Sequence, residues 1–347
     1  MKLNKLFAMI LSIAILTATL GTAGAIADEK KLSIVTTIFP IHDWVREIAG
    51  TEGNADITLL LDSGVDLHSY QPTAADILKI ATCDVFVYVG GESEAWVEDV
   101  LKDAINPNMV VINLLECLGE DVKMEELVEG MQHEHDEDHE EDHEHHGEDH
   151  EHEGDHGEED HEHDHEHEEE ADEHVWLSLR NAQKLVTAIT VRLAEADPVH
   201  AGIYQANAEA YIEKLSALDA EYTEATEQAT YKTILFGDRF PFRYLADDYG
   251  LTYYAAFSGC SAETEASFQT IVFLAQKMDE LGLPAVLTIE GTNHKIAETI
   301  IQTTADKHQK LLTLHSMQGI TAADVQAGTS YLAIMQANLD VLKEALK

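Results

Sequence analysis

The sequence predicts an α/β protein made of two βα lobes, each built on a parallel sheet and joined to the other by one long rigid helix. Two observations support this class. Short apolar strands alternate with helices both before residue 115 and after residue 230, and a helical stretch with a single apolar stripe lies between these regions. Buried strands that alternate with helices are typical of parallel sheets covered on both faces. The 347 residues suffice for two domains with separate cores.

The first lobe is predicted to span residues 28–196. Its expected elements, in order, are a strand at 31–40, a helix at 41–50, a strand at 55–61, a helix from Thr73 to Ala81, a strand at 84–91, a helix at 93–105 capped by Ser93, and a strand at 109–114. This alternation indicates parallel βα units.

A linking helix is predicted over residues 197–229. Asp197 followed by Pro198 is a typical helix start, with an N-cap and a proline at the first helical position. Apolar residues then recur at steps of four and three, at Tyr204, Ala208, Tyr211, Leu215, Leu218 and Tyr222. One such stripe on about thirty residues indicates a rod of roughly 45 Å that could join the lobes.

The second lobe is predicted to span residues 230–347. Its expected elements, in order, are strands and helices at 232–236, 242–250, 251–257, 265–281, 285–290, 296–304 and 311–314, followed by a terminal amphipathic helix at 330–346. Thr321 and Asp324 have the spacing of a capping box.

The N-terminus has the pattern of an export signal over residues 1–27. Lys2 and Lys5 precede an apolar segment, and small residues precede Asp28. We therefore expect an exported protein, periplasmic or at the cell surface, and an uncleaved anchor is the alternative. No cysteine stands near this segment to carry a lipid, and three cysteines in all argue against a disulfide framework.

A tract of histidine and acidic residues interrupts the first lobe. Residues 132–173 contain 24 of the 66 acidic residues and no lysine or arginine, and the other 42 acids still outnumber the 21 basic residues. This charge repels nucleic acid and attracts divalent cations, so nucleic-acid binding is excluded. We expect residues 131–172 to form a disordered loop whose thirteen histidines bind Zn²⁺ weakly. Its three H-E-x-x-H matches follow from composition and do not predict catalysis.

Three of the seven histidines outside the tract stand at loops where ligands bind in α/β folds. His68 precedes the helix at Thr73, His174 lies where the tract ends, and His315 follows the strand at 311–314. Ligands bind beyond the carboxyl ends of parallel strands, so these imidazoles could converge between the lobes.

The order of motifs resembles the metal-specific solute-binding proteins of bacterial ABC importers, the zinc and manganese cluster. The segments that carry the resemblance are GVDLHSYQPTAADILKIATCDVFVYVGGESEAW, then the His-rich tract, then EHVWLSLRNAQKLVTAI and DPVHAGIYQANAEAYIEKLSALD. The resemblance runs from about residue 34 to the C-terminus. It implies a metal held by four side chains in the cleft between the lobes, with His68 as the first ligand and His174 as the second.

The second half departs from this family's pattern. The position that matches the third ligand is Arg239, and a guanidinium offers only donors. The fourth position matches His315. Asp238 is the first candidate for the missing ligand, and Glu290, Cys260 or a water are the alternatives. Arg239 could pair with one of these acids.

The resemblance implies high-affinity capture of Zn²⁺ and its delivery to an ABC permease with a cytoplasmic ATPase. The tract would act as a zinc collector, the metal would be the transported ligand, and the chain would be a monomer without enzymatic activity. A nitrogen-rich site favours zinc over manganese, and affinity should fall as pH drops near the histidine pKa of about 6.5. The alternatives are a manganese-binding protein, an extracellular zinc buffer or adhesin, and a zinc hydrolase.

Overall fold

The computed structural model describes residues 31–50, 53–132, 170–261, 265–291 and 293–347. The predicted signal peptide and nearly all of the predicted disordered loop lie outside the described residues.

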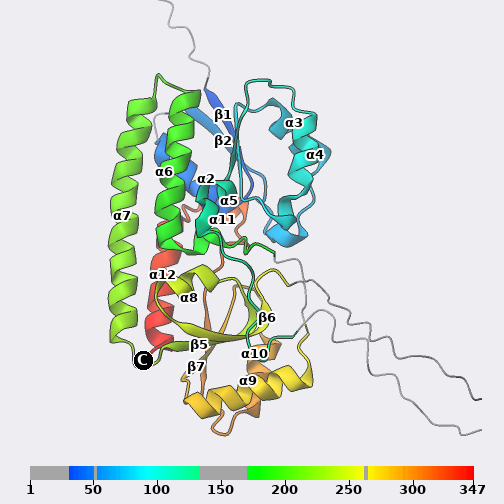
Figure 1. The fold of residues 1–347 in the computed structure, drawn as a ribbon, viewed down its shortest axis with the longest axis vertical. Helices are drawn as coiled ribbons and strands as arrows, with labels where there is room; N and C mark the ends of the chain where they lie inside the picture. Colours follow the sequence, from blue (N-terminus) through cyan, green and yellow to red (C-terminus); the bar gives the residue numbers. More distant parts are fainter. Residues whose placement is uncertain (1–30, 51–52, 133–169, 262–264, 292) are drawn as a thin grey trace, which may run out of the picture. The chain divides into compact units, whose positions relative to one another are not determined.

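The described chain contains two four-stranded parallel sheets, which confirms the predicted α/β class (Figure 1). The strand order is β2-β1-β3-β4 in the first sheet and β6-β5-β7-β8 in the second, and every pairing within them is parallel. The strands are β1 (Leu32–Thr36), β2 (Ala55–Leu59), β3 (Val85–Tyr88), β4 (Val110–Asn113), β5 (Thr233–Phe240), β6 (Thr252–Ser258), β7 (Ala285–Thr288) and β8 (Lys310–Thr313). Both sheets belong to one compact unit, Leu32–Lys347.

Helices connect the strands in each sheet. They are α2 (Phe39–Ala49), α3 (Ala74–Thr82), α4 (Trp96–Lys102), α5 (Leu114–Leu118), α6 (Leu179–Ala196), α7 (Ala201–Gln228), α8 (Arg243–Asp248), α9 (Phe268–Leu281), α10 (Lys295–Thr303), α11 (Ala322–Gln326) and α12 (Tyr331–Ala345). In the second sheet, α9 contacts β5 and β6, whereas α12 contacts β7 and β8. The predicted capping box at Thr321 and Asp324 is present at the start of α11.

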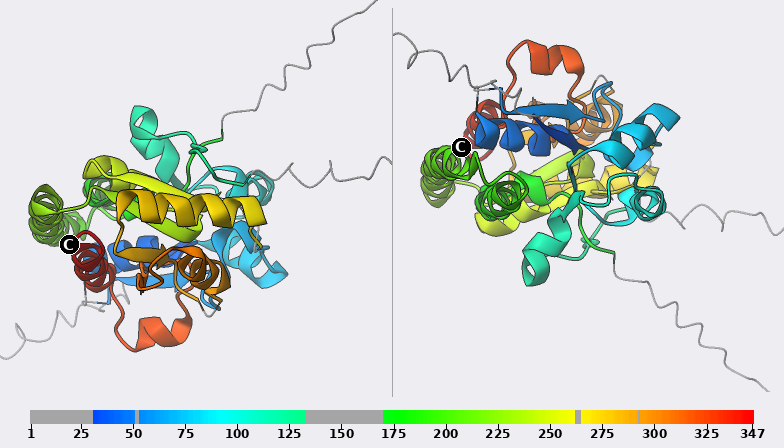
Figure 2. Two further views of the ribbon diagram at one scale, coloured as in Figure 1. Left: turned by 90° about the horizontal axis from the view of Figure 1, so that it is seen from below. Right: turned by 90° about the horizontal axis from the view of Figure 1, so that it is seen from above.

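The predicted long helix is α7, and its six apolar stripe residues are all buried. It packs against α6 and α2 on the side of the first sheet and against α12 on the side of the second (Figure 2). A single rigid helix therefore contacts elements from both halves of the chain.

The predicted start of α7 was wrong by several residues. Asp197 ends α6 as its C-cap, and α7 begins only at Ala201. The Asp197 carboxylate accepts a hydrogen bond from the Tyr204 hydroxyl at 2.8 Å and pairs with His200 Nδ1 at 2.6 Å. The Asp197 side chain therefore contacts the start of α7 from outside that helix. The Asp-Pro pattern had predicted that Asp197 itself would be the N-cap of the helix.

Candidate metal centre

Two of the predicted ligands, His68 and His174, lie side by side. His68 is in the 3-10 helix η1 (Leu67–Ser69), beyond the carboxyl end of β2, and His174 is the N-terminal residue before η5 (Val175–Leu177). Their Nε2 atoms are 3.2 Å apart, and His174 is fully buried. Zn–N bonds of about 2.1 Å at tetrahedral angles place two nitrogens about 3.4 Å apart. The two rings therefore already have the spacing of two ligands on one zinc ion.

Each ring is oriented by a partner on its other nitrogen. His174 Nδ1 lies 3.0 Å from Asp172 Oδ1, an oxygen that also accepts the His174 backbone N–H at 2.9 Å. His68 Nδ1 lies 2.7 Å from Ser93 Oγ. A carboxylate that accepts the Nδ1 proton leaves the Nε2 lone pair free for a metal and makes it more basic. The described geometry thus directs both Nε2 atoms to one point.

Ser93 has a different role from the predicted one. It belongs to the 3-10 helix η2 (Glu92–Glu94), and α4 begins later at Trp96 without a side-chain cap. Its hydroxyl meets His68, and its backbone N–H donates to Glu173 Oε1 at 2.8 Å. Because Glu173 directly precedes His174, Ser93 links the loop that carries His68 to the loop that carries His174.

The Glu173 carboxylate is packed tightly against backbone. A Cβ on Gly91, whose φ is +87°, would lie 2.3 Å from Glu173 Oε1, so only glycine fits here. Glu173 Oε2 is 3.7 Å from His68 Nδ1. Burial raises the pKa of Glu173 above its usual value.

Cys260 is the third potential ligand close to this pair. Among the described residues, His68, His174 and Cys260 each offer a ligand atom within 4.8 Å of the other two. Cys260 follows β6, and its backbone N–H donates to Glu125 Oε1 at 3.0 Å. Burial, with the nearby Glu125 carboxylate, raises the pKa of the Cys260 thiol far above its usual value.

His68 stays neutral at lower pH than an ordinary histidine. Burial and the adjacent His174 ring lower the pKa of His68 to about 4. The expectation that protons compete for the site near pH 6.5 therefore does not hold for this ligand.

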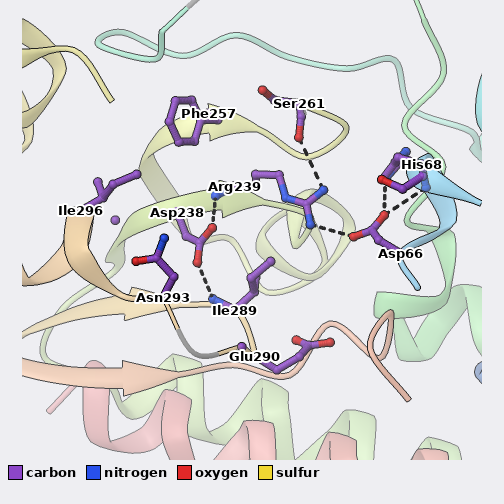
Figure 3. A pocket seen from close by; sticks show the side chains of 13 residues that line it. Asp66, His68, Asp238, Arg239, Phe257, Ser261, Ile289, Glu290, Asn293 and Ile296 are labelled. Atoms are coloured by element: carbon purple, nitrogen blue, oxygen red, sulfur yellow. Dashed lines mark hydrogen bonds and ion pairs between the residues drawn. The ribbon is translucent and has the colours of Figure 1, made fainter. Parts of the chain in front are cut away.

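Arg239 pairs with Asp66 and not with one of the acids considered from the sequence (Figure 3). Its Nη2 donates to Asp66 Oδ2 at 2.7 Å, and Asp66 Oδ1 accepts the His68 backbone N–H at 3.0 Å. Although burial alone would raise it, the Arg239 guanidinium holds the pKa of Asp66 below its usual value. Arg239 lies on β5 and Asp66 follows β2, so this ion pair connects the second half of the chain to the His68 loop.

Asp238 lines a cavity of about 370 Å³ together with Asp66, His68, Arg239 and Glu290 (Figure 3). Its Oδ1 accepts the Arg239 N–H at 2.9 Å, and its Oδ2 accepts the Ile289 N–H at 3.3 Å. Both carboxylate oxygens are therefore occupied by backbone donors of the second sheet.

His315 is placed in a network with Glu290. Its Nδ1 lies 3.3 Å from Glu290 Oε1 and 2.9 Å from the Met317 backbone N, while the Asn338 side chain accepts the His315 backbone N–H and donates to its carbonyl oxygen. Although burial alone would raise it, the hydrogen bond with His315 and those from backbone N–H groups lower the pKa of Glu290 to about 2. Within the described residues, neither His315 nor Asp238 belongs to the close group formed by the other two histidines and Cys260.

The two chain segments that flank residues 133–169 are paired close to this group. Met124 and Ala171 form an antiparallel bridge, and Asp172 N–H donates to Lys123 O at 2.8 Å. The Tyr244 hydroxyl accepts the Lys123 N–H and donates to Asp172 O, each at 2.9 Å. The described chain resumes at Glu170, two residues before Asp172, which contacts His174.

No helix within the described ranges has the length and apolar character needed to cross a bilayer.

Comparison with known proteins gives one consistent set of relatives. The family model described as "Zinc-uptake complex component A periplasmic", ZnuA, matches residues 34–345. The high-affinity zinc uptake system protein ZnuA of Bacillus subtilis is 32% identical over 330 residues, which cover 95% of this chain and 92% of that protein. The zinc-binding protein AdcA of Streptococcus pyogenes serotype M3 is 31% identical over 93% of this chain, which spans only 58% of AdcA.

Solved structures agree with these relatives. The Zn(II)-bound ZnuA-like domain of Streptococcus pneumoniae AdcA has a TM-score of 0.67 at 29% identity and covers 91% of this chain and 99% of that one. The metal-dependent lipoprotein YcdH of Bacillus subtilis has a TM-score of 0.68 at 28% identity, with the same coverage of both chains.

Proposed function

Because this chain belongs to the ZnuA family of zinc-uptake components, we propose that it captures Zn²⁺ outside the cytoplasm and delivers it to the permease of an ABC importer. The pair of converging imidazoles carries this proposal, since their Nε2 atoms already lie 3.2 Å apart and each ring is fixed by a partner on Nδ1. Zinc is the cargo in this account and not a catalytic cofactor.

Nitrogen ligands support zinc over manganese as the cargo. Mn²⁺ prefers carboxylate and water oxygens, whereas imidazole suits Zn²⁺. The Asp172 carboxylate lies on the Nδ1 side of His174, and the Glu173 carboxylate lies on the Nδ1 side of His68, so both act behind the imidazoles. This arrangement raises imidazole basicity without supplying oxygen ligands.

His315 and Asp238 remain predicted ligands. A metal on His315 Nε2 requires the ring proton on Nδ1, where it can be donated to Glu290 Oε1 but can no longer accept the Met317 backbone N–H. Asp238 would have to give up one of its two backbone hydrogen bonds. Closure of the His315 loop onto the ion would exchange the Met317 hydrogen bond to Nδ1 for one that Nδ1 donates to Glu290.

The histidine-rich tract is proposed to collect zinc for this site. Met124, which precedes the tract, pairs with Ala171 at its C-terminal side, and the adjacent Asp172 contacts His174. Zn²⁺ bound weakly by the tract's histidines would therefore be concentrated beside the tight site.

We propose a binding protein and not a hydrolase. The relatives at 31–32% identity are named for zinc binding and zinc uptake. The acids next to the two imidazoles hold the loops in place: Asp172 orients His174, Glu173 accepts the Ser93 N–H, and Asp66 pairs with Arg239.

Chelator competition with the full chain tests zinc capture. A competing chelator in excess leaves the weak tract sites empty, so only the tight site is counted. We expect one tight Zn²⁺, loss of that ion in His68→Ala and in His174→Ala, and no change in His308→Ala, a matched control at an exposed histidine. Tight binding that survives both site variants, or a preference for Mn²⁺, would overturn the proposal.

Delivery needs a separate measurement. The permease and ATPase encoded in the same genome, reconstituted in vesicles, should hydrolyse ATP faster with the zinc-loaded wild-type chain than with His174→Ala. Equal stimulation by both proteins would argue for a zinc buffer instead of a transport component.

A further inference from the structure

We propose that the Cys260 thiolate is the third metal ligand, which makes the site a His₂Cys centre. This inference rests on the proposed function, because it assigns a ligand to the same cation. One ligand atom from each of His68, His174 and Cys260 lies within 4.8 Å of the other two. A tetrahedral zinc with Zn–S of about 2.3 Å and Zn–N of about 2.1 Å needs N···S separations of about 3.6 Å. A movement of about 1 Å in the Cys260 loop would complete the coordination.

The sheet topology explains why the ligand comes from β6. Arg239 occupies the position on β5 where a ligand was expected, and its guanidinium is committed to Asp66. Strands β5 and β6 are parallel neighbours, with Arg239 opposite Phe257 and Phe240 opposite Ser258. Cys260 follows two residues after Ser258, so it emerges at the same sheet edge as Arg239. The neighbouring strand therefore replaces the ligand that β5 lacks.

Gly259 allows this loop to approach His174. A Cβ at this position would lie 3.0 Å from His174 Cε1 and 3.0 Å from the Phe240 carbonyl oxygen. Glu125 then fixes the following residue, because its carboxylate accepts the Cys260 backbone N–H at 3.0 Å. The Glu125 N–H in turn donates to Glu170 O at 2.8 Å, so the Cys260 loop is tied to the chain segment that leads to His174.

A thiolate changes the preference of the site. Cysteine binds metals as the thiolate, so the S–metal bond forms as the thiol proton leaves to solvent. Two imidazoles and one thiolate select softer ions such as Zn²⁺, Cd²⁺ and Co²⁺, and disfavour Mn²⁺ and Mg²⁺. In the metal-free protein the thiol stays protonated in its buried position, so a thiolate signal should appear only when a metal binds.

Cobalt provides a direct probe of this ligand in the full chain. Co²⁺ bound to a thiolate gives a sulfur-to-metal charge-transfer band in the near ultraviolet. The tract contains no cysteine, so cobalt bound there cannot produce this band. We expect the band to grow to saturation at one equivalent of Co²⁺ in the wild type and to be lost in Cys260→Ser. The control Cys117→Ser removes an exposed thiol and should keep the band.

The outcomes separate this inference from the proposed function. A band that persists in Cys260→Ser, or a wild-type protein that binds Co²⁺ through His68 and His174 without any band, overturns the Cys260 assignment and leaves zinc capture intact. Co²⁺ binding that is insensitive to His68→Ala and His174→Ala overturns both. Because a variant could fold poorly, ¹¹³Cd NMR of the wild type gives a second measurement, in which a thiolate ligand shifts the resonance strongly downfield and a nitrogen- and oxygen-only shift refutes the proposal.

Discussion

Replacement of Asp172 by asparagine isolates the effect of the carboxylate that orients His174. Asp172 Oδ1 accepts two hydrogen bonds from the same residue, from its backbone N–H at 2.9 Å and from Nδ1 at 3.0 Å. The amide oxygen of asparagine can still accept both bonds, so the ring stays in place. The negative charge that makes Nε2 a stronger donor to the metal is lost.

The expected loss of zinc affinity follows from the role of a carboxylate that binds the second ring nitrogen of a metal-binding histidine. Loss of a carboxylate behind a metal-binding histidine costs about 10- to 100-fold in metal affinity. That range equals about 1.4 to 2.7 kcal/mol of binding free energy. In Asp172→Ala the two hydrogen bonds are also lost. A buried donor left without a partner costs about 1–3 kcal/mol of folding stability.

The assay is chelator competition for the first zinc equivalent, with thermal unfolding of the metal-free protein measured in parallel. Asp172→Asn should weaken zinc binding 10- to 100-fold with little change in stability, whereas Asp172→Ala should reduce both. The control Asp121→Asn makes the same charge change at an exposed ion pair with Lys184 and should stay within about 0.5 kcal/mol of the wild type. Zinc affinity of Asp172→Asn within twofold of the wild type would refute the reasoning.

Three further predictions concern the same site. The His68 ring should titrate near pH 4 in the metal-free protein, as measured by NMR, and a midpoint near 6.5 would contradict this. The unfolded chain binds this proton from pH 6.5 downward, whereas the folded chain does not. The folded state should therefore lose up to about 3 kcal/mol of stability as the pH falls from 6.5 to 4. Asp66→Asn and Arg239→Met should each weaken zinc binding, and a double-mutant cycle should give a coupling of about 1 kcal/mol or more, whereas additive effects would show that the ion pair does not hold the His68 loop. Gly259→Ala should reduce zinc affinity by displacing the loop from His174 without loss of fold, and unchanged affinity would show that this close approach is not required.

The fold and part of the site could be predicted because both depend on local sequence patterns. Alternating apolar strands and helices specify parallel sheets, and the strand-loop-helix position of His68 indicated a ligand-binding edge. The positions of Cys260 and Asp66 could not be obtained in this way, because they depend on strand order. Only the adjacency of β5 and β6 brings Cys260 beside the expected ligand position.

Two errors have the same physical origin. His42 stands among polar neighbours on a helix-like segment, a pattern that predicts an ordinary surface or cap histidine, yet it is buried in α2, where burial and Arg46 lower the pKa of His42 to about 4. Ser93 was expected to cap a helix, yet its hydroxyl meets His68. In both cases tertiary packing decides what a polar side chain contacts, and the neighbours along the chain do not carry that information. A polar residue two positions after a glycine pair that ends a buried strand, as at Gly90 and Gly91, is the one signal that could have pointed to Ser93.

The central claim is that one zinc ion lies between His68 and His174, and anomalous diffraction at the zinc absorption edge tests it most directly. Crystals of the full chain grown with one equivalent of Zn²⁺ should show a single strong peak about 2.1 Å from both Nε2 atoms. A strong peak elsewhere, with no peak between the two Nε2 atoms, would contradict the account.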